Sequence, residues 1–191
     1  MWLAVVLKLF MPGSEQYAAD IEKQAKRYKF DPLLVAAVVF KESGFKKDSC
    51  YKGSHGLMQI QLRPRSCEGS MARAIELGLY QPSKNIERGV RMMATWRRWW
   101  RKYHKDDGYH WLLHYNRGFG SCPDGKKYCP TVERRPTSAG SGYADRVLKI
   151  YRRLKKIRVR PSPTRRPARD LGGVVDATSS LSVSRRCRGS A

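Results

Sequence analysis

The sequence lacks any apolar run long enough to cross a bilayer. A membrane-spanning helix needs roughly 18 or more consecutive apolar residues, and no stretch of the chain approaches this. Apolar residues still make up 41% of the 191 residues, enough for the core of one domain. The first segment, MWLAVVLKLF, contains Lys8 and has no basic stretch before it. We therefore predict that residues 1–13 form a helix packed on the core, with a weak export signal as the alternative.

Acidic residues are scarce, with 16 Asp and Glu against 39 Lys and Arg, for a net charge of +23. Residues 158–191 hold eight Arg and two Asp, so +6 belongs to this segment and the remaining +17 to residues 1–157. Such an excess attracts polyanions without selecting among nucleic acid, acidic membranes and wall polymers. Beyond residue 157 the mixture of Arg, Pro and Ser cannot bury enough apolar surface, so residues 158–191 are predicted to be a disordered basic tail.

CxxC pairs are absent from the five cysteines, which argues against a four-cysteine zinc site. Cys50 and Cys67 flank the segment GSHGLMQI, Cys122 and Cys129 flank PDGKKY, and Cys187 stands alone. This pattern favours two loop-closing disulfides and one spare thiol, as in proteins of an oxidising compartment. Zinc coordination is the alternative.

In few segments do apolar and polar residues alternate as they do in strands, whereas in several the apolar residues recur at helical spacing. Asp31 followed by Pro32 predicts a helix start, and residues 33–40, LLVAAVVF, are apolar on every side, as in a helix buried all round. Ser14 is predicted to cap a helix that follows it, whose apolar side is Tyr17, Ile21, Ala25 and Tyr28. Apolar stripes at 86–103 and 143–157 predict two longer helices, with a short one at 109–115 between them. The predicted fold class is all-α, with one helical domain at residues 14–157.

Glu42 stands at the end of the predicted buried helix, just before a natural helix stop at Gly44. Burial and the negative end of the helix dipole raise the pKa of its carboxyl group, while Lys41, Lys46 and Lys47 lower it. Because loop lysines are solvated and their charges are screened, we expect the effect of burial to be the larger one and the pKa of Glu42 to be raised. A carboxylic acid that keeps its proton suits the cleavage of a glycosidic bond. The alternative is an exposed glutamate paired with lysine.

A second carboxylate, which most glycosidases need, is not evident. The candidates are Asp48, Glu68, Asp106 and Asp107, and none follows an apolar run as Glu42 does. A single carboxyl group suits a reaction in which it first protonates the leaving oxygen and then deprotonates a hydroxyl of the sugar itself.

Five short motifs follow one another along the chain: KESGF at 41–45, GLMQI at 56–60, NIERGV at 85–90, HYNRG at 114–118 and YADRV at 143–147. In this order and spacing they closely resemble the catalytic domain of soluble lytic transglycosylases. The resemblance extends over most of the folded chain, from Tyr17 to Leu154. It implies a goose-type lysozyme-like fold and peptidoglycan as the substrate.

The resemblance implies roles for individual residues. Glu42 matches the family's catalytic acid and base, and Ser43 would lie near the bond that is cut. Met58 and Gln59 would line the substrate groove, Met58 as an apolar wall and Gln59 through a hydrogen bond to the sugar chain.

Later motifs imply further roles. Tyr115 and Asn116 match the family's substrate-binding Tyr-Asn pair. Tyr143 would reach toward the catalytic glutamate and orient it. Asn85 and Gly89 are expected to be scaffold.

The implied reaction cuts between N-acetylmuramic acid and N-acetylglucosamine, with the muramic C6 hydroxyl attacking C1 to leave a 1,6-anhydro end. It needs no metal or organic cofactor. The alternatives are a hydrolytic lysozyme on the same fold and a noncatalytic basic binder of wall polymer or nucleic acid. The predicted partners are peptidoglycan strands, then anionic wall polymers and phage or secretion machinery, with nucleic acid disfavoured. A monomer in the cell envelope, whether periplasmic, extracellular or virion-associated, is expected.

Two departures from the family pattern stand out. His114 replaces a small alanine, and we predict a core or surface histidine there in preference to a catalytic one. The loop at 121–142 is longer than the family minimum and is expected to overhang the groove, stiffened by its two cysteines. His55 is predicted to be a loop residue.

Overall fold

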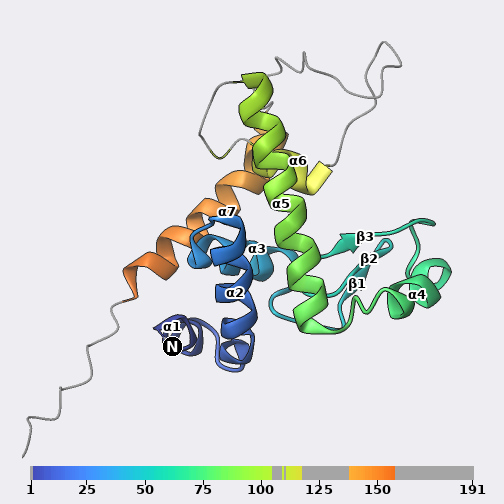
Figure 1. Cartoon of the computed structure of the whole chain (residues 1–191), viewed down its shortest axis with the longest axis horizontal. Helices are drawn as coiled ribbons and strands as arrows, with labels where there is room; N and C mark the ends of the chain where they lie inside the picture. The colour runs from blue at the N-terminus through green and yellow to red at the C-terminus, as the bar shows by residue number, and fades with distance from the viewer. Residues whose placement is uncertain (1, 105–108, 110, 118–137, 158–191) are drawn as a thin grey trace, which may run out of the picture. The chain divides into compact units, whose positions relative to one another are not determined.

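The computed structural model describes residues 2–104, 109, 111–117 and 138–157. These residues are mainly helical, with one small sheet, which confirms the predicted fold class (Figure 1). The elements are α1 (Trp2–Phe10), the 3-10 helix η1 (Ser14–Tyr17), α2 (Ala18–Tyr28), α3 (Pro32–Ser43), β1 (Cys50–Tyr51), β2 (Ser54–His55), β3 (Ile60–Gln61), α4 (Cys67–Glu76), α5 (Pro82–His104), α6 (Trp111–Arg117) and α7 (Ser138–Lys156).

Helix α3 lies at the centre of the core, with α2 and α7 packed against it. All residues from 33 to 39 are buried, as predicted for a helix that is apolar on every side. Its start is capped as expected, because Asp31 Oδ1 accepts a hydrogen bond from Leu33 N at 2.8 Å and a proline fills the first turn. Gly44 ends the helix with φ 60°, a left-handed conformation that glycine adopts without strain.

Helices α5 and α7 bury the apolar stripes that the sequence predicts. The buried residues are Ile86, Val90, Met93 and Trp96 on α5 and Tyr143, Val147, Ile150 and Leu154 on α7. The short helix predicted at 109–115 is observed as α6, shifted toward the C-terminus. Helix α5 packs on α2 and α6, and α7 packs on α3 and α6, so the last helix closes the core against α3 (Figure 1).

The N-terminal segment forms helix α1, which buries Leu3, Val6 and Leu7 in the core. An export role for residues 1–13 stays a prediction. The predicted cap at Ser14 is wrong: its hydroxyl donates to the carbonyl of Met11 at 2.7 Å, because Ser14 begins the 3-10 helix and α2 starts later. Among the helices of the described residues, none combines the length and the apolar character of a membrane span.

A three-stranded antiparallel sheet in the order β1-β2-β3 is a feature that the sequence did not predict. His55 pairs with Cys50 on one side and with Ile60 on the other. Strands of two residues are too short to show an alternating pattern. The sheet folds the segment GSHGLMQI back beside the end of α3, where Leu57 O accepts a hydrogen bond from Ser43 Oγ.

Cys50 and Cys67 form the predicted disulfide, with Cα atoms 6.0 Å apart, so neither is a zinc ligand. The bond links β1 to the start of α4. Cys122, Cys129 and Cys187 lie outside the described residues, as does the tail at 158–191. Of the predicted loop at 121–142, residues 138–142 belong to α7 and the rest is not described.

The prediction that His55 is a loop residue is wrong. His55 is completely buried in β2, which packs against α4. Its Nδ1 lies 2.6 Å from the Tyr80 hydroxyl and its Nε2 lies 2.7 Å from the Ser70 hydroxyl. Burial lowers the pKa of His55 below 6.5, so the neutral ring is favoured, as suits a structural histidine.

Candidate active site

A groove of about 520 Å³ lies where the end of α3, the sheet, α5 and α6 meet. Glu42 comes from α3, Gln59 from the turn before β3, Met92 and Trp96 from α5, and Tyr115 from α6. Among the described residues that line the groove, Glu42 is the one carboxylate. The sequence places these residues far apart, and the packing of α5 and α6 beside α3 brings them together.

Glu42 is half-buried in the last turn of α3. The hydroxyl of Tyr143 donates a hydrogen bond to its Oε1. Burial raises the pKa of Glu42 and outweighs the hydrogen bond from Tyr143 and the positive charge of Lys41, which both lower it. This direction agrees with the expectation from the sequence. A carboxyl group that keeps its proton to higher pH than usual is equipped to act as a general acid.

Tyr143 and Tyr115 approach Glu42 from α7 and α6. Tyr115 donates a hydrogen bond to the backbone oxygen of Met58 at 2.9 Å, beneath the groove. Burial first, and the negative charge of Glu42 second, hold the pKa of each phenol well above its ordinary value. Both tyrosines therefore remain hydrogen-bond donors. The contact between Tyr143 and Glu42 is the one that the resemblance implies.

Met58 does not line the groove, so the prediction that it touches the sugar chain is wrong. Its side chain is 0% exposed. It fills the space over Gly89 of α5, where an added Cβ would come within 2.3 Å of Met58 Sδ. The turn after β2 directs this side chain into the core, and Met92 and Trp96 supply the apolar wall in its place.

Ser43 and Gln59 hold the groove together with their own hydrogen bonds. Ser43 Oγ donates to Leu57 O at 2.8 Å and ties the end of α3 to the turn after β2. Gln59 lines the groove with a left-handed φ of 48°, and its Nε2 donates to Gly56 O at 2.9 Å. Its Oε1 has no hydrogen-bond partner among the described residues and is available to accept one from a ligand.

Asn85 anchors the groove from below, in line with the scaffold role implied for it. Its Oδ1 accepts from Met58 N at 2.7 Å, and its Nδ2 donates to His55 O at 2.9 Å and to Leu79 O at 2.8 Å. Gly56 lies directly above this side chain with φ 76°, and a Cβ there would come within 2.2 Å of Leu79 O. The backbone therefore runs too close to Asn85 for any residue larger than glycine.

His114 is half-buried among the tryptophans of α5, as a core histidine would be. Its ring centroid lies 5.4 Å from those of Trp96 and Trp99 and 5.5 Å from that of Trp100. It therefore supports the apolar wall from behind. Asn116 lies within α6, but its side chain is outside the described part of the chain.

Several groove residues were missed in the sequence. Tyr51, Lys52 and Arg65 lie in or near the unpredicted sheet, so their place at the groove depends on strand pairing. Met92 and Trp96 are four residues apart on one side of α5, a spacing that could have identified an apolar wall.

The other candidate carboxylates lie elsewhere. Asp48 and Glu68 are exposed and do not line the groove, and Asp106 and Asp107 are outside the described residues.

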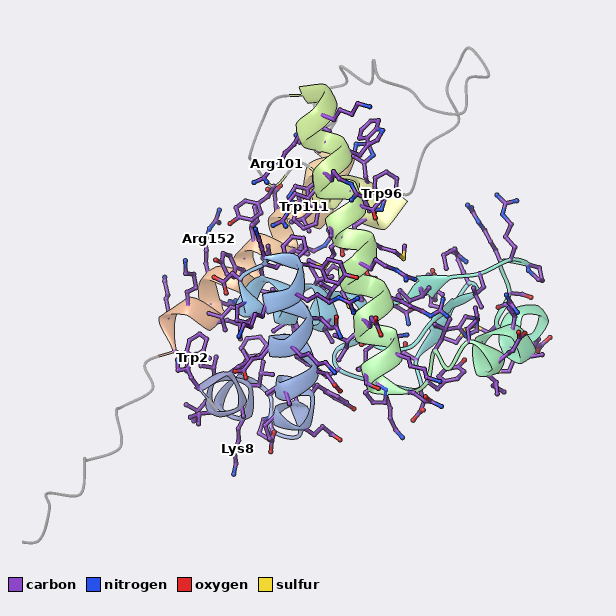
Figure 2. The ribbon with its side chains drawn as sticks, viewed as in Figure 1. Trp2, Lys8, Trp96, Arg101, Trp111 and Arg152 are labelled. Atoms are coloured by element: carbon purple, nitrogen blue, oxygen red, sulfur yellow. A yellow bond between two sulfur atoms is a disulfide. The ribbon has the colours of Figure 1, made fainter. Side chains whose placement is uncertain are left out.

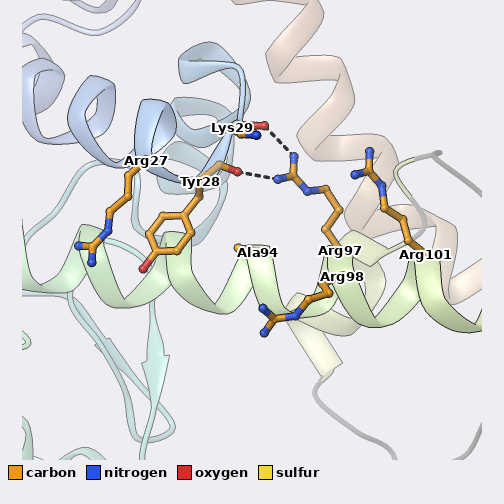
Figure 3. A pocket seen from close by; sticks show the side chains of 7 residues that line it. All are labelled: Arg27, Tyr28, Lys29, Ala94, Arg97, Arg98 and Arg101. Atoms are coloured by element: carbon orange, nitrogen blue, oxygen red, sulfur yellow. Dashed lines mark hydrogen bonds between the residues drawn. The ribbon is translucent and has the colours of Figure 1, made fainter.

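A second, basic cleft of about 340 Å³ lies between α2 and α5 (Figure 3). Arg97 spans it and donates to Tyr28 O at 2.6 Å and to Lys29 O at 2.8 Å, which satisfies carbonyls at the C-terminus of α2. Arg27 at its rim pairs with Glu87 at 3.0 Å. Part of this charge thus has a structural role. Figure 2 labels two further basic side chains, Lys8 on α1 and Arg152 on α7.

Comparison with known proteins identifies the family of this chain. The family model described as the transglycosylase SLT domain matches residues 20–136. Membrane-bound lytic murein transglycosylase C of Actinobacillus pleuropneumoniae serotype 5b (strain L20) is 32% identical over an alignment of 93 residues, and the match covers 44% of this chain and 25% of the relative. The proteins of the same name from serotype 3 (strain JL03) and serotype 7 (strain AP76) match equally. The chain therefore spans about a quarter of the length of these relatives.

Because the family model matches more than half of the chain, this protein belongs to the transglycosylase SLT domain family.

Proposed function

We propose that this chain is a peptidoglycan lytic transglycosylase, which cuts the β-1,4 bond between N-acetylmuramic acid and N-acetylglucosamine and leaves a 1,6-anhydro end. The observation that carries the proposal is the carboxyl group of Glu42, half-buried at the groove, bonded to Tyr143 and with a raised pKa. Family membership and the names of the relatives support the same class of activity.

Glu42 acts as the acid in the first step. Its proton passes to the glycosidic oxygen while the bond between that oxygen and C1 of the muramic residue breaks. Tyr143 is a positioning residue, because its hydroxyl holds one carboxyl oxygen and leaves the other for the substrate. The acetamido group of the substrate helps to stabilise the charge that develops at C1.

Glu42 acts as the base in the second step. The C6 hydroxyl of the same muramic residue attacks C1, a C1–O6 bond forms, and the hydroxyl proton returns to the Glu42 carboxylate. Water is not consumed, and the glutamate ends the cycle protonated as it began. One carboxyl group is therefore sufficient for this chemistry.

The walls of the groove suit a sugar chain. Trp96 and Met92 offer an apolar face to the carbon–hydrogen surface of the sugar rings, and Gln59 Oε1 offers a hydrogen-bond acceptor. Tyr115 lies at the base of the groove, and Asn116 follows it in α6. Ser43 supports the site through its bond to Leu57 and would lie near the scissile bond.

The test is digestion of purified peptidoglycan followed by mass spectrometry of the released muropeptides. The wild-type chain is expected to release anhydro-ended products, which are lighter than reducing-ended ones by one water. Glu42→Gln should release none, whereas Glu68→Gln, at an exposed site on α4, should behave as wild type. Normal cleavage by Glu42→Gln would refute Glu42 as the acid.

Two other outcomes would favour the alternatives. Reducing ends in place of anhydro ends would make the chain a hydrolytic lysozyme on the same fold. Retention on wall fragments that is lost at high salt, without any released product, would favour a basic binder acting through the cleft between α2 and α5.

A location in the cell envelope fits the proposed substrate. The disulfide between Cys50 and Cys67 is typical of compartments outside the reducing cytoplasm. The relatives are named membrane-bound proteins, which supports the same location.

A further inference from the structure

Helix α1 exposes an apolar face to solvent. Its core-facing side is buried, but Trp2 is 48% exposed, Val5 43% and Leu9 63%. Their spacing of three and four residues places these side chains on one side of the helix. No other helix of the described residues exposes as many large apolar side chains. Single exposed apolar side chains are common, but a group of them on one face indicates an interaction surface.

The surface next to this face is strongly basic. Lys8 is exposed on α1 itself, and α1 packs against α7. Figure 2 shows Trp2 close to the C-terminal end of α7. The C-terminal half of α7 carries six exposed cations: Arg146, Lys149, Arg152, Arg153, Lys155 and Lys156. Neither residues 2–10 nor residues 146–157 contain an acidic residue.

None of these cations belongs to an ion pair within the part of the chain that the structure describes. The ion pairs there involve Arg27, Lys47 and Arg73. Two carboxylates near α1 are bonded to backbone N–H groups: Glu22 accepts from Leu3 N at 3.3 Å, and Glu15 accepts from Gly13 N at 2.6 Å. The positive charge beside the apolar face is therefore available to an external anion.

An apolar helix face bordered by cations is typical of helices that lie in the plane of a membrane surface. Such a helix inserts its apolar side roughly 5–10 Å into the bilayer, while Lys and Arg contact the anionic headgroups. Tryptophan favours the headgroup level, where its ring is apolar and its N–H remains hydrated. A stable protein interface buries roughly 800 Å² on each side, more than three partly exposed side chains supply. The combination therefore favours lipid over a protein partner.

We infer that α1 and the C-terminal end of α7 form a docking surface for an anionic lipid bilayer. Trp2, Val5 and Leu9 enter the headgroup region, and Lys8 and the cations of α7 contact the lipid phosphates. The inference goes beyond the proposed function, because binding to lipid does not depend on cleavage. Helix α1 does not line the groove, and in Figure 1 it lies on the other side of α2 and α5 from the three strands. Docking thus leaves the groove open to glycan strands.

The test measures binding of the full chain to unilamellar vesicles by flotation. We expect vesicles of phosphatidylglycerol and phosphatidylethanolamine to bind at least about tenfold more tightly than vesicles of phosphatidylcholine, because each Lys or Arg near an anionic surface contributes roughly fivefold. Salt should weaken this binding without abolishing it, since apolar insertion is not screened. Complete release at about 0.5 M salt would assign the contact to charge alone and overturn the inference.

A pair of apolar variants locates the surface. Trp2→Ser combined with Leu9→Ser should weaken binding to anionic vesicles about tenfold or more. The thermal midpoint should change little, because both side chains are exposed. The matched control is Met71→Ser combined with Ile75→Ser, which removes two exposed apolar side chains from α4 and should bind as wild type. Equal binding by the two variants would overturn the inference.

A pair of charge variants separates the basic end of α7 from the net charge of the chain. Arg152→Gln combined with Lys156→Gln should weaken binding to anionic vesicles about tenfold or more. Arg91→Gln combined with Arg98→Gln removes the same charge from exposed residues of α5 and should weaken it no more than about twofold. Equal losses would show that net charge alone governs binding and would refute the docking surface.

Tryptophan fluorescence reports the depth of α1. Lipids with brominated chains should quench the emission of the wild type, and Trp2→Phe, which keeps the remaining tryptophans, should lose this quenching. Equal quenching in both would place another surface on the lipid. Sedimentation without vesicles tests a second copy as the occupant: a dimer that Trp2→Ser combined with Leu9→Ser converts to a monomer, together with no vesicle binding, would also overturn the inference.

Discussion

The replacement of Asn85 by alanine is expected to destabilise the fold through the floor of the active-site groove. Asn85 is completely buried, and its side chain makes hydrogen bonds with Met58 N, His55 O and Leu79 O at 2.7, 2.9 and 2.8 Å. Alanine removes all of these bonds and leaves three backbone groups without this partner in a place that water does not reach. The substitution therefore removes the hydrogen bonds that connect the sheet and the turn after β2 to α5.

The magnitude follows from the number of bonds lost. Each buried polar group left without a partner costs at least about 1 kcal/mol, so Asn85→Ala should lower the free energy of unfolding by about 3 kcal/mol. For a folded region of this size that corresponds to a fall in Tm of about 6–12 °C. The cavity left by the amide adds to the loss.

Urea denaturation and thermal melting, both followed by far-UV circular dichroism, would measure the effect. Thr95→Ala is the matched control, because Thr95 lies on the same helix. Its hydroxyl also donates a hydrogen bond, to Arg91 O at 3.1 Å, but this bond is exposed to solvent. This control should change the free energy of unfolding by less than about 0.5 kcal/mol. A loss below about 1 kcal/mol in Asn85→Ala would show that its bonds do not hold the groove floor.

Further predictions concern the disulfide and the pair formed by Glu42 and Tyr143. Replacing Cys50 and Cys67 together by alanine should lower the free energy of unfolding by about 3 kcal/mol, and an unchanged urea midpoint would contradict this. Because burial raises the pKa of Glu42, the folded protein holds a proton that the unfolded chain releases, and stability falls as pH rises from the unfolded pKa through the folded one. Glu42→Gln should thus be more stable than wild type near neutral pH and gain nothing below about pH 4, as denaturation at several pH values would show. The bond from Tyr143 lowers the pKa of Glu42, so Tyr143→Phe should move the alkaline limb of the kcat/KM profile to higher pH, and a limb that moves down would refute this role.

The helices could be predicted because their signals lie within a few residues of one another. Asp31, Gly44 and the apolar run between them define α3 through capping and burial, both of which depend on local sequence. The position of Glu42 at the end of this buried helix was enough to predict the direction of its pKa shift, because desolvation by the same helix is the largest cause.

The floor and one wall of the groove could not be predicted in this way. Met58 and Gln59 are neighbours, yet one is buried in the core and the other lines the groove, because the turn after β2 and the left-handed φ at Gln59 turn them in different directions. Strands of two residues are too short for apolar and polar residues to alternate in a recognisable pattern. The sequence pattern therefore could not predict the burial of His55.

By itself the sequence determined the helical class, the caps of the central helix and the residue that carries the candidate chemistry. It did so because hydrophobic periodicity and capping act over one or two helical turns. Only the tertiary structure decided what surrounds that residue: the bond from Tyr143 joins side chains 101 residues apart, and the cations Lys52 and Arg65 reach the groove through strand pairing and a disulfide. Contacts of this kind arise when elements pack, and packing depends on the whole chain.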